Sequence, residues 1–371
     1  NLDFSNEPIL QAFVDDGVIA PSTVVLEKGR EIGIIGAITP ELNFISSPRD
    51  VVVNQDVVGK IQAQVDQLTA EGVEIIILIS HLQDIDEDIA LAAQLDDVDV
   101  MVAGGGDETL ANPDDLLVPG DSVFGPYPVL GTDIDGTTVP VVTTAGDYKY
   151  LGKLIVDFDG DGNVLAADGG PIRIAGGDNP DGVRSNRLMQ KRVVDPVIEF
   201  VAGLAENIVA TSEVALEGRR DPGVRTEETN LGNLMADSQL WQATLLAADF
   251  GVPTPDVALQ NGGGIRNNSL IPAGPISELN TFEIAPFSNF ISIVPDIPRA
   301  QFKQILERAL SGAPSASGRF AQVAGFSLEY DVDGTAQELN PDGTILVPGS
   351  RVVEVTLDNG TSIVSGGAVV A

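Results

Sequence analysis

The first half of the chain switches repeatedly between continuous apolar runs and helical spacing of apolar positions. Residues 30–38 and 73–79 are apolar runs of the length typical of buried strands. Residues 54–71 between them, and residues 86–95 after them, space their apolar side chains as helices do. Another apolar run covers residues 98–103. This alternation predicts a mainly parallel sheet with helices on its faces.

The second half of the chain has a different pattern, in which longer helices are set among short strands and turns. Helical spacing predicts helices at about residues 196–210, 230–248 and 299–310. An apolar run predicts a strand at residues 290–294, and the tail over residues 320–369 is typical of strands joined by turns. The tail carries the hairpin signals Asp333-Gly334, Asp342-Gly343 and Asn359-Gly360.

A stretch rich in Gly, Asp, Asn and Pro, residues 176–190, separates the two patterns. We therefore expect a first domain over residues 1–175, a linker over residues 176–194 and a second domain over residues 195–371. A chain of 371 residues is long enough for two domains that each bury a core. The expected fold class is α/β for the first domain and α+β for the second.

The charge balance bears on the partners that the chain can have. With 20 basic and 55 acidic residues, the formal net charge is −35. Phosphate contacts of a nucleic-acid polymer need Lys and Arg, so such a polymer is not an expected partner. A charge of this size keeps a chain in solution and attracts cations, as expected in salty surroundings. The hydrophobic content of 43% excludes a disordered acidic tail.

The sequence also bears on membrane and redox properties. No run of about 18 apolar residues occurs, so we expect no transmembrane segment. The start shows no basic and then apolar leader, so we expect a signal peptide to be absent or already removed. The lack of cysteine excludes disulfides and thiolate metal sites.

A glycine-rich stretch, residues 261–266, is the first candidate for a binding site. It follows an apolar run that has the character of a strand end, residues 256–259. Its three consecutive glycines are able to take positive φ and to lie close against a ligand. Asn261 and Arg266 on either side offer an amide and a guanidinium fork, which suit carboxylate or phosphate. The alternative is a tight surface turn.

His81, the only histidine of the chain, is a candidate metal ligand. It follows the run 73–79, while Asp107 and Glu108 follow the run 98–103 through a glycine turn. Because ligands bind beyond the carboxyl ends of strands in such sheets, we expect His81 and Glu108 to lie close together. A metal would need His81, carboxylates and a further donor. A structural, hydrogen-bonded histidine is the alternative.

An acidic loop over residues 157–168 fits two readings. Asp157, Asp159 and Asp161 match a calcium-binding loop in outline. The flanking residues are strand-like rather than helical, and Asp-Gly pairs between apolar runs favour a hairpin. A hairpin is the favoured prediction, and calcium at these three aspartates is the alternative.

Four ordered motifs of the second half resemble the C-terminal, substrate-binding domain of the 5′-nucleotidase family of metallophosphoesterases. The motifs are residues 225–234, 256–266, 286–289 and 318–325. The first half is similar to the latter part of that family's dinuclear metallophosphatase domain. There Asp3-Phe4 resembles the segment after a Gly-Asn-His-Glu motif, and Ser80-His81-Leu82 resembles a metal-ligand strand.

The chain also departs from the family pattern. The resemblance implies that the Asp-x-His, Gly-Asp and Gly-Asn-His-Glu motifs should precede Asn1, and that a Gly-Gly-Asp-Gly-Tyr motif should follow Ala371. It therefore implies a fragment that lacks both ends and contains no catalytic residue. Residues 104–108 replace the family's Gly-Gly-His-Ser-His/Gln turn, so that Glu108 stands where a metal ligand is expected.

The resemblance implies a nucleotide site in the second domain. Arg225 and Arg266 would hold the ribose or phosphate side, and Phe287 would stack on the base. The other expected substrate-binding residues are Asn233, Asn261, Gly263 and Asn289. The alternative for Phe287 is an ordinary core aromatic. The alternative for Arg225 is a surface ion pair with Glu227 or Glu228.

The function implied by the resemblance is hydrolysis of nucleotide phosphate esters with two divalent metal ions, which would activate a water. His81 and Glu108 are the implied metal ligands in this chain, and a small-molecule nucleotide is the implied partner. The implied location is extracellular, periplasmic or at the cell surface. The alternative function is a non-catalytic acidic surface or matrix protein that keeps the fold. The sequence does not indicate an oligomeric state.

Overall fold

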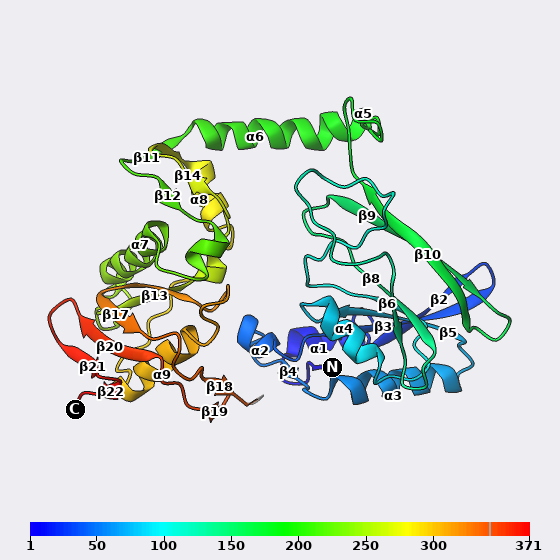
Figure 1. Cartoon of the computed structure of the whole chain (residues 1–371), viewed down its shortest axis with the longest axis horizontal. Helices are drawn as coiled ribbons and strands as arrows, with labels where there is room; N and C mark the ends of the chain where they lie inside the picture. The colour runs from blue at the N-terminus through cyan, green and yellow to red at the C-terminus, as the bar shows by residue number, and fades with distance from the viewer. Residues whose placement is uncertain (341–342) are drawn as a thin grey trace. The chain divides into compact units, whose positions relative to one another are not determined.

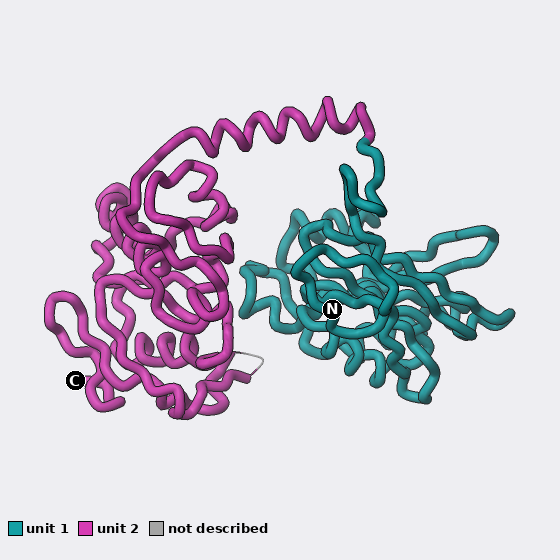
Figure 2. Tube along the Cα trace, turned by 45° about the horizontal axis from the view of Figure 1, so that its top comes forward, with its two compact units in different colours: residues 1–185 teal, residues 186–371 magenta. Residues whose placement is uncertain are grey.

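A computed structural model describes residues 1–340 and 343–371, and these divide into two units (Figures 1 and 2). Unit 1 comprises Asn1–Ser185 and unit 2 comprises Asn186–Ala371. Residues 176–185 of the predicted linker therefore fall in unit 1, and residues 186–194 fall in unit 2. Each of the hydrophobic clusters described below draws its residues from one unit only.

Unit 1 is built on a six-stranded sheet in the order β2-β3-β5-β6-β8-β7. Its strands are β2 (Ser22–Glu27), β3 (Arg30–Ile38), β5 (Ile75–His81), β6 (Val100–Val102), β7 (Val129–Thr132) and β8 (Thr138–Val142). The β3-β5, β5-β6 and β6-β8 pairs are parallel, and the two edge pairs are antiparallel. The predicted mainly parallel sheet is thus confirmed, with β5 and β6 as neighbours.

Two helices pack on this sheet, α3 (Val57–Ala70) and α4 (Ile85–Ala92). Helix α3 buries Val57, Ile61, Val65 and Leu68 at the helical spacing that the sequence shows. These side chains join those of the central strands in one core. The remaining elements of unit 1 are β1 (Leu2–Asp3), α1 (Pro8–Asp15), α2 (Leu42–Ile45), β4 (Val52–Val53), β9 (Tyr150–Phe158) and β10 (Val164–Arg173).

Unit 2 begins with a continuous helical stretch of α5 (Arg187–Met189), a π-helical turn (Gln190–Val194) and α6 (Asp195–Glu206). The helix predicted from residue 196 thus begins earlier, because residues 187–194 also take helical geometry. None of the residues of α5 and α6 is buried. The four basic side chains Arg184, Arg187, Lys191 and Arg192 around its start are exposed. This boundary stretch is therefore accessible to solvent.

The other helices of unit 2 are α7 (Asn230–Leu246), α8 (Glu278–Ile284) and α9 (Arg299–Ala309). A four-stranded antiparallel sheet has the order β17-β20-β21-β22, formed by β17 (Phe326–Tyr330), β20 (Val352–Leu357), β21 (Ser362–Ser365) and β22 (Ala368–Val369). Helix α9 packs on this sheet through Phe302, Leu306 and neighbouring side chains. Unit 2 therefore has the α+β class that the sequence predicts.

Short two-stranded ladders make up the rest of unit 2. They are β11 (Ile208–Ser212) with β15 (Gly274–Ser277), β12 (Leu216–Glu217) with β14 (Leu270–Ile271), β13 (Ala258–Asn261) with β16 (Ala321–Ala324), and β18 (Glu338–Leu339) with β19 (Ile345–Val347). The β13-β16 ladder is antiparallel and places Gln260 opposite Gln322. This ladder carries two of the motifs on which the resemblance rests.

Two predictions for unit 2 are wrong. Residues 290–294 are irregular and exposed rather than a strand, with Phe290 96% exposed. An apolar run forms a strand only when a neighbouring strand pairs with its backbone, and the described sheets offer no such pairing.

The hairpin predicted at Asp333-Gly334 is the second wrong prediction. These residues lie in a turn, but the strand before them, β17, pairs with β20 rather than with the next strand, β18. The Asn359-Gly360 hairpin between β20 and β21 is confirmed, and Asp342 lies outside the described residues.

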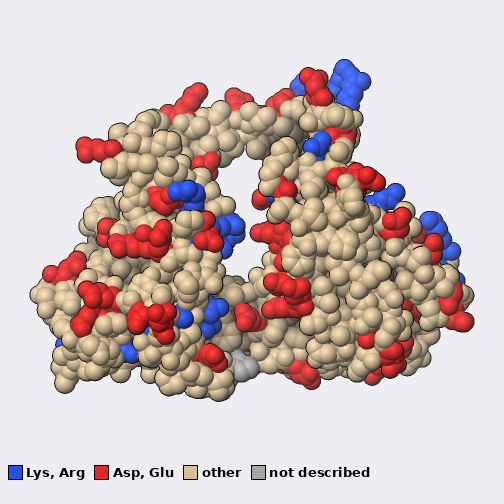
Figure 3. Space-filling view, viewed as in Figure 1, with Lys and Arg blue, Asp and Glu red and all other residues tan. Residues whose placement is uncertain are grey.

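The surface shows the charge of the sequence. Asp and Glu side chains are spread over the visible face of both units (Figure 3). Among the described residues, no helix is both long enough and apolar enough to cross a membrane.

Candidate functional site

The three glycines at residues 262–264 form a short 3₁₀ turn at the end of β13. None of them has a positive φ, so the expected reason for glycine here is wrong. A Cβ at Gly262 would lie 2.0 Å from the carbonyl oxygen of Val224, and a Cβ at Gly263 would lie 2.9 Å from that of Gly318. Glycine is required because other backbone segments approach this turn too closely for a side chain.

Two hydrogen bonds fix the turn against the segment that precedes β16. The Gly262 N–H donates to Phe320 O at 2.7 Å, and the Gly263 N–H donates to Gly318 O at 2.8 Å. Asn261 adds a side-chain bond from Nδ2 to Gly318 O at 3.3 Å. The motifs at residues 256–266 and 318–325 therefore form one continuous piece of structure.

Arg225 lies beside this turn, because Val224 is the residue whose carbonyl group abuts Gly262. The backbone of Arg225 is held on both sides: its N–H donates to Arg220 O at 3.3 Å, and its carbonyl accepts from Ser317 N at 3.0 Å. Its side chain is half-buried. The structure thus brings Arg225 next to Gly262, although 37 positions separate them in the sequence (262 − 225).

Arg266 and Phe287 form a cation–π pair on the other side of the turn. The guanidinium carbon of Arg266 lies 5.4 Å from the centre of the Phe287 ring. Arg266 Nη1 also donates to Gly263 O at 3.3 Å, and the Arg266 N–H donates to Ile284 O at 2.9 Å. Phe287 is 52% exposed, so its reading as a core aromatic is wrong. The ring is accessible to a ligand.

A cavity of about 930 Å³ in unit 2 contains other parts of the predicted site. Asn261, Phe287 and Asn289 line it, together with apolar side chains from α7, β13 and the irregular stretch 290–294. Asn233 is placed differently. It lies in the first turn of α7, its Nδ2 donates to Glu228 Oε1 at 2.7 Å, and it is not among the cavity-lining residues. Arg225, Gly263 and Arg266 do not line the cavity either. They lie at the glycine turn and in the segments that contact it, and Arg266 reaches Phe287 at the cavity wall.

Sequence reasoning missed Gln322 and Gln260, two buried side chains that hydrogen-bond to backbone groups of the site. Gln322 is 1% exposed and Gln260 is 8% exposed. Gln260 Nε2 donates to Asn261 O at 2.9 Å, and its Oε1 accepts from Gln239 of α7. The available signal was a polar residue among apolar ones in the β13 and β16 motifs. Such a side chain is buried only with hydrogen-bond partners, so its position indicates a structural role.

In unit 1, His81 and the turn of residues 104–108 lie together at the carboxyl ends of β5 and β6. A Cβ at Gly104 would lie 3.4 Å from His81 Nδ1, so the turn packs against the exposed imidazole. The Glu108 carboxylate folds over Gly106, and its Oε2 is buried without a hydrogen-bond partner among the described residues. A buried, unpartnered carboxylate oxygen in a turn that contacts a histidine is the kind of donor that a cation accepts.

This end of the sheet does not make a complete metal centre by itself. The described residues contain no group of three or more His, Cys, Asp or Glu that could hold a metal ion. Metal binding by His81 and Glu108 therefore stays a prediction. Beneath them, Ser80 Oγ donates to Asp88 Oδ1, and burial of the fully enclosed Asp88 raises its pKa to about 6.

The acidic loop after β9 is a hairpin, as favoured from the sequence. Strands β9 and β10 pair antiparallel on either side of it. The Asp159 carboxylate accepts the N–H groups of Asp161 and Asn163 at 2.9 Å, and hydrogen bonds from Asn163 above all lower its pKa. These bonds keep Asp159 engaged within the turn. Calcium at Asp157, Asp159 and Asp161 stays a prediction.

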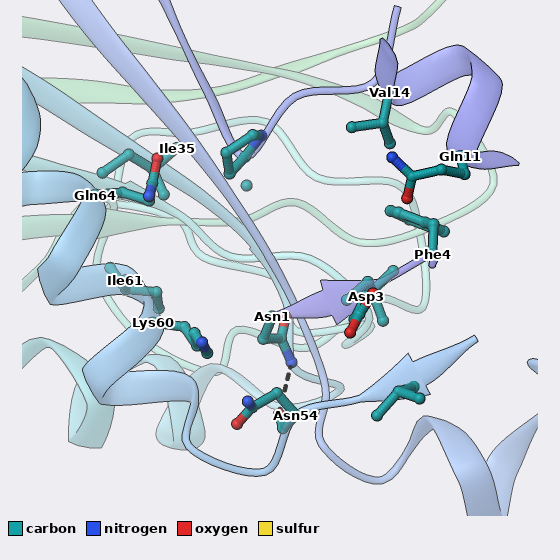
Figure 4. Close-up of a pocket in the computed structure, with 14 residues that line it drawn as sticks. Asn1, Asp3, Phe4, Gln11, Val14, Ile35, Asn54, Lys60, Ile61 and Gln64 are labelled. Atoms are coloured by element: carbon teal, nitrogen blue, oxygen red, sulfur yellow. Dashed lines mark hydrogen bonds between the residues drawn. The ribbon is translucent and has the colours of Figure 1, made fainter. Parts of the chain in front are cut away.

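A second cavity, of about 390 Å³, lies in unit 1 beside Asn1 (Figure 4). Its polar lining includes Asp3, Asn54, Lys60 and Gln64. The Asn1 side chain donates to Asn54 O at 3.4 Å and to Ile38 O at 2.9 Å, which ties the start of the chain to β3. None of the predicted site residues lines this cavity.

Known proteins resemble this chain over most of its length. Residues 208–366 match the family described as 5′-nucleotidase, C-terminal domain. The chain is 30% identical to the snake venom 5′-nucleotidase of Macrovipera lebetinus over 336 residues, covering 88% of this chain and 75% of that protein. It is 29% identical to the 5′-nucleotidase of Mus musculus over 325 residues, covering 85% of this chain and 53% of the mouse protein.

A solved structure shows the same fold. The crystal structure of the 5′-nucleotidase precursor from Thermus thermophilus matches with a TM-score of 0.70 and 33% sequence identity, covering 97% of this chain and 64% of that chain. The α/β unit followed by an α+β unit is thus an arrangement found in this class of protein. The chain belongs to the 5′-nucleotidase family. It spans about half the length of the mouse relative.

Proposed function

We propose that this chain takes part in the hydrolysis of nucleotide phosphate esters, with unit 2 binding the nucleotide. Membership of the 5′-nucleotidase family supports this reaction class. The observation that carries the proposal is the Arg266–Phe287 pair beside the glycine turn. It holds an exposed aromatic ring and a cation together in a protein with a net charge of −35.

The chemistry of these side chains suits a nucleotide. An exposed aromatic ring stacks on any purine or pyrimidine base, because every base has a π-face. Guanidinium groups make charge-assisted, forked hydrogen bonds with phosphate and with ribose oxygens. Asn261 and Asn289 add amide groups on the wall of the cavity that Phe287 also lines. One ligand that carries base, sugar and phosphate is able to use all of these contacts at once.

Two divalent metal ions belong to the proposal because the family resemblance implies them. His81 and Glu108 are the side chains of this chain proposed to contribute. The buried, unpartnered Glu108 Oε2 and the packing of Gly104 against the His81 imidazole support this proposal. Two donors are too few for a dinuclear centre, and the described residues add no further group. Cleavage of the phosphate ester is therefore assigned to no side chain of this chain.

We also propose an extracellular, periplasmic or cell-surface location. The relative from Macrovipera lebetinus is a venom protein by name, and the Thermus thermophilus relative is named a precursor. The acidic surface fits salty surroundings, in which a large net charge keeps a protein in solution.

Calorimetric titration with adenosine 5′-monophosphate tests the binding proposal. Phe287→Ala should weaken binding by about 1–3 kcal/mol, the value of one base–aromatic stack. Arg266→Ala should also weaken it, and Arg266→Lys should restore only part of the loss, because an ammonium group lacks the fork. Phe282→Ala is the matched control, since Phe282 is 50% exposed in the same unit and does not line the cavity.

Unchanged affinity in both Phe287→Ala and Arg266→Ala would show that the motif serves only as a scaffold. Release of inorganic phosphate from the same nucleotide separates hydrolysis from the alternative function. Binding without phosphate release, in the presence of divalent metal ions, would favour a non-catalytic surface protein.

A further inference from the structure

The fully buried amide of Gln322 has a bonding pattern that packing alone does not explain. Gln322 lies on β16 and is 1% exposed. Its Nε2 donates to Val224 O at 3.1 Å and to Glu227 O at 2.8 Å, and its Oε1 accepts from Thr229 N at 3.2 Å. Both N–H groups and the oxygen are thus satisfied, as burial of an amide requires.

All three partners of Gln322 lie in one loop, the turn of residues 223–229, and they stand on both sides of Arg225. Val224 precedes Arg225, and Glu227 and Thr229 follow it. The turn has irregular backbone geometry, with Gly223 at a φ of 153°. A loop without a regular ladder depends on side chains to satisfy its backbone groups. Gln322 does this from within the core.

Gly232 shows that the fit around Gln322 is close on its other side. A Cβ at Gly232 would lie 2.1 Å from Gln322 Oε1. Glycine lowers the stability of a helix interior, and Gly232 lies in the first turn of α7. Its absence of a side chain lets α7 approach the Gln322 amide. The loop that carries Arg225 and the start of α7 are therefore both placed by this one side chain.

We propose that Gln322 is a positioning residue for nucleotide binding, acting through Arg225. Its hydrogen bonds hold the backbone of the 223–229 turn against the β13-β16 ladder, where Val224 O contacts Gly262. Arg225 is thereby kept beside the glycine turn and its neighbours Asn261 and Arg266. This inference rests on the proposed function, because the ligand that Arg225 meets is the nucleotide of that proposal.

A double-mutant cycle in the full 371-residue chain tests this role, with adenosine 5′-monophosphate as the probe. Gln322→Met keeps the length of the side chain and removes its three hydrogen bonds. It should weaken binding roughly tenfold to a hundredfold, the range for losing one hydrogen bond to a charged group. In an Arg225→Ala background the same substitution should have less than about a twofold effect, because the two residues act on one contact.

Gln337→Met is the matched control. Gln337 is another buried glutamine of unit 2, 4% exposed, whose Nε2 donates to Gln304 O at 3.2 Å. Its loss should lower thermal stability and leave nucleotide affinity unchanged. If Gln322→Met does not fold, Gln322→Glu takes its place, because a carboxylate still accepts from Thr229 N but repels the two carbonyl oxygens.

The outcomes separate this inference from the proposed function. If the unaltered chain does not bind the nucleotide, the proposed function is wrong. The positioning role is tested only after the unaltered chain binds the nucleotide and Arg225→Ala weakens that binding. In that case, the role is wrong if the Gln322 substitution has no effect on binding, or if its effect adds fully to that of Arg225→Ala. Equal losses in the Gln322 and Gln337 variants would also overturn it, since they would show a general effect of destabilising unit 2.

Discussion

Burial of one carboxyl group, that of Asp99, links the stability of unit 1 to pH. Asp99 lies just before β6, and its Oδ2 accepts from Ile76 N at 2.7 Å. Burial, with smaller contributions from the charges of Asp97 and Asp133, raises its pKa to about 7. In the unfolded chain the group ionises near pH 4. The folded protein therefore binds more protons between these values, and its stability falls as pH rises from about 4 to 7.

We predict that Asp99→Asn reduces this pH dependence. The asparagine oxygen still accepts from Ile76 N but carries no charge at any pH, so the variant should lose less thermal stability than the unaltered protein between about pH 5 and pH 8. Thermal unfolding at the two pH values measures the difference. Asp86→Asn, at an exposed position of α4, is the control. Equal pH slopes for Asp99→Asn and the unaltered protein would contradict the assignment.

Single residues also show what the sequence could and could not predict of the site. Arg266 and Phe287 are found from motifs, and their pairing at 5.4 Å agrees with a shared site. Gln322 was not found, because a buried amide is recognised only when its partners in another segment are known. The glycines at residues 262–264 were found for the wrong reason. Steric contact with Val224 and Gly318 is a tertiary property that no local pattern contains.

At the scale of elements, helix α7 connects the site to the stability of unit 2. Thr229 caps it: Thr229 Oγ1 accepts from Gly232 N at 3.0 Å, while the Thr229 N–H donates to Gln322. The cap satisfies an N–H group that the helix itself cannot pair. The beginning of α7 is thus fixed by one residue that also borders the Arg225 turn.

We predict that Thr229→Ala lowers the free energy of unfolding by about 0.5–2 kcal/mol, the usual cost of losing a helix cap. Thr229→Ser keeps the hydroxyl group and should retain most of the stability. Chemical denaturation followed by circular dichroism compares the three proteins. A serine variant as unstable as the alanine variant would show that the methyl group, and not the cap, is what matters.

Elements with clear periodicity were predicted well, and the failure at residues 290–294 has a definite cause. Strand β3 and helices α3 and α9 bury the apolar positions that their spacing indicates. Helix α7 forms where it was predicted, but Leu234 and Leu245 of its predicted apolar face are exposed. An apolar run such as 290–294 has no periodicity that distinguishes a strand from a cavity wall. These residues line the 930 Å³ cavity together with β13 instead of pairing with a strand.

At the scale of the whole molecule, the two units have separate cores, which explains why the change of pattern near residue 180 was informative. The largest core of unit 1 uses strands and helices up to Val142, and the cores of unit 2 begin at Leu216. The apolar residues of each core all come from one part of the chain. The exact boundary could not be predicted, because residues 187–194 join the helix without burying any side chain, so no buried face marks where the helix begins.

The exposed boundary between the units should be the first place where a protease cuts. Trypsin cleaves after Lys and Arg, and four of the 20 basic residues lie within residues 184–192. Arg184 precedes the helix and is exposed, whereas Arg187, Lys191 and Arg192 are protected by helical backbone. We predict that brief digestion cuts first after Arg184 and leaves two fragments that retain secondary structure.

Mass spectrometry of the early products identifies the cut, and Arg184→Gln should slow it. First cuts inside either unit would mean that local opening within a unit is easier than access to the boundary. The scarcity of basic residues thus gives this acidic protein few sites for trypsin-like proteases. Four of the 20 lie within residues 184–192, and Arg184 is the one among them that lies outside a helix.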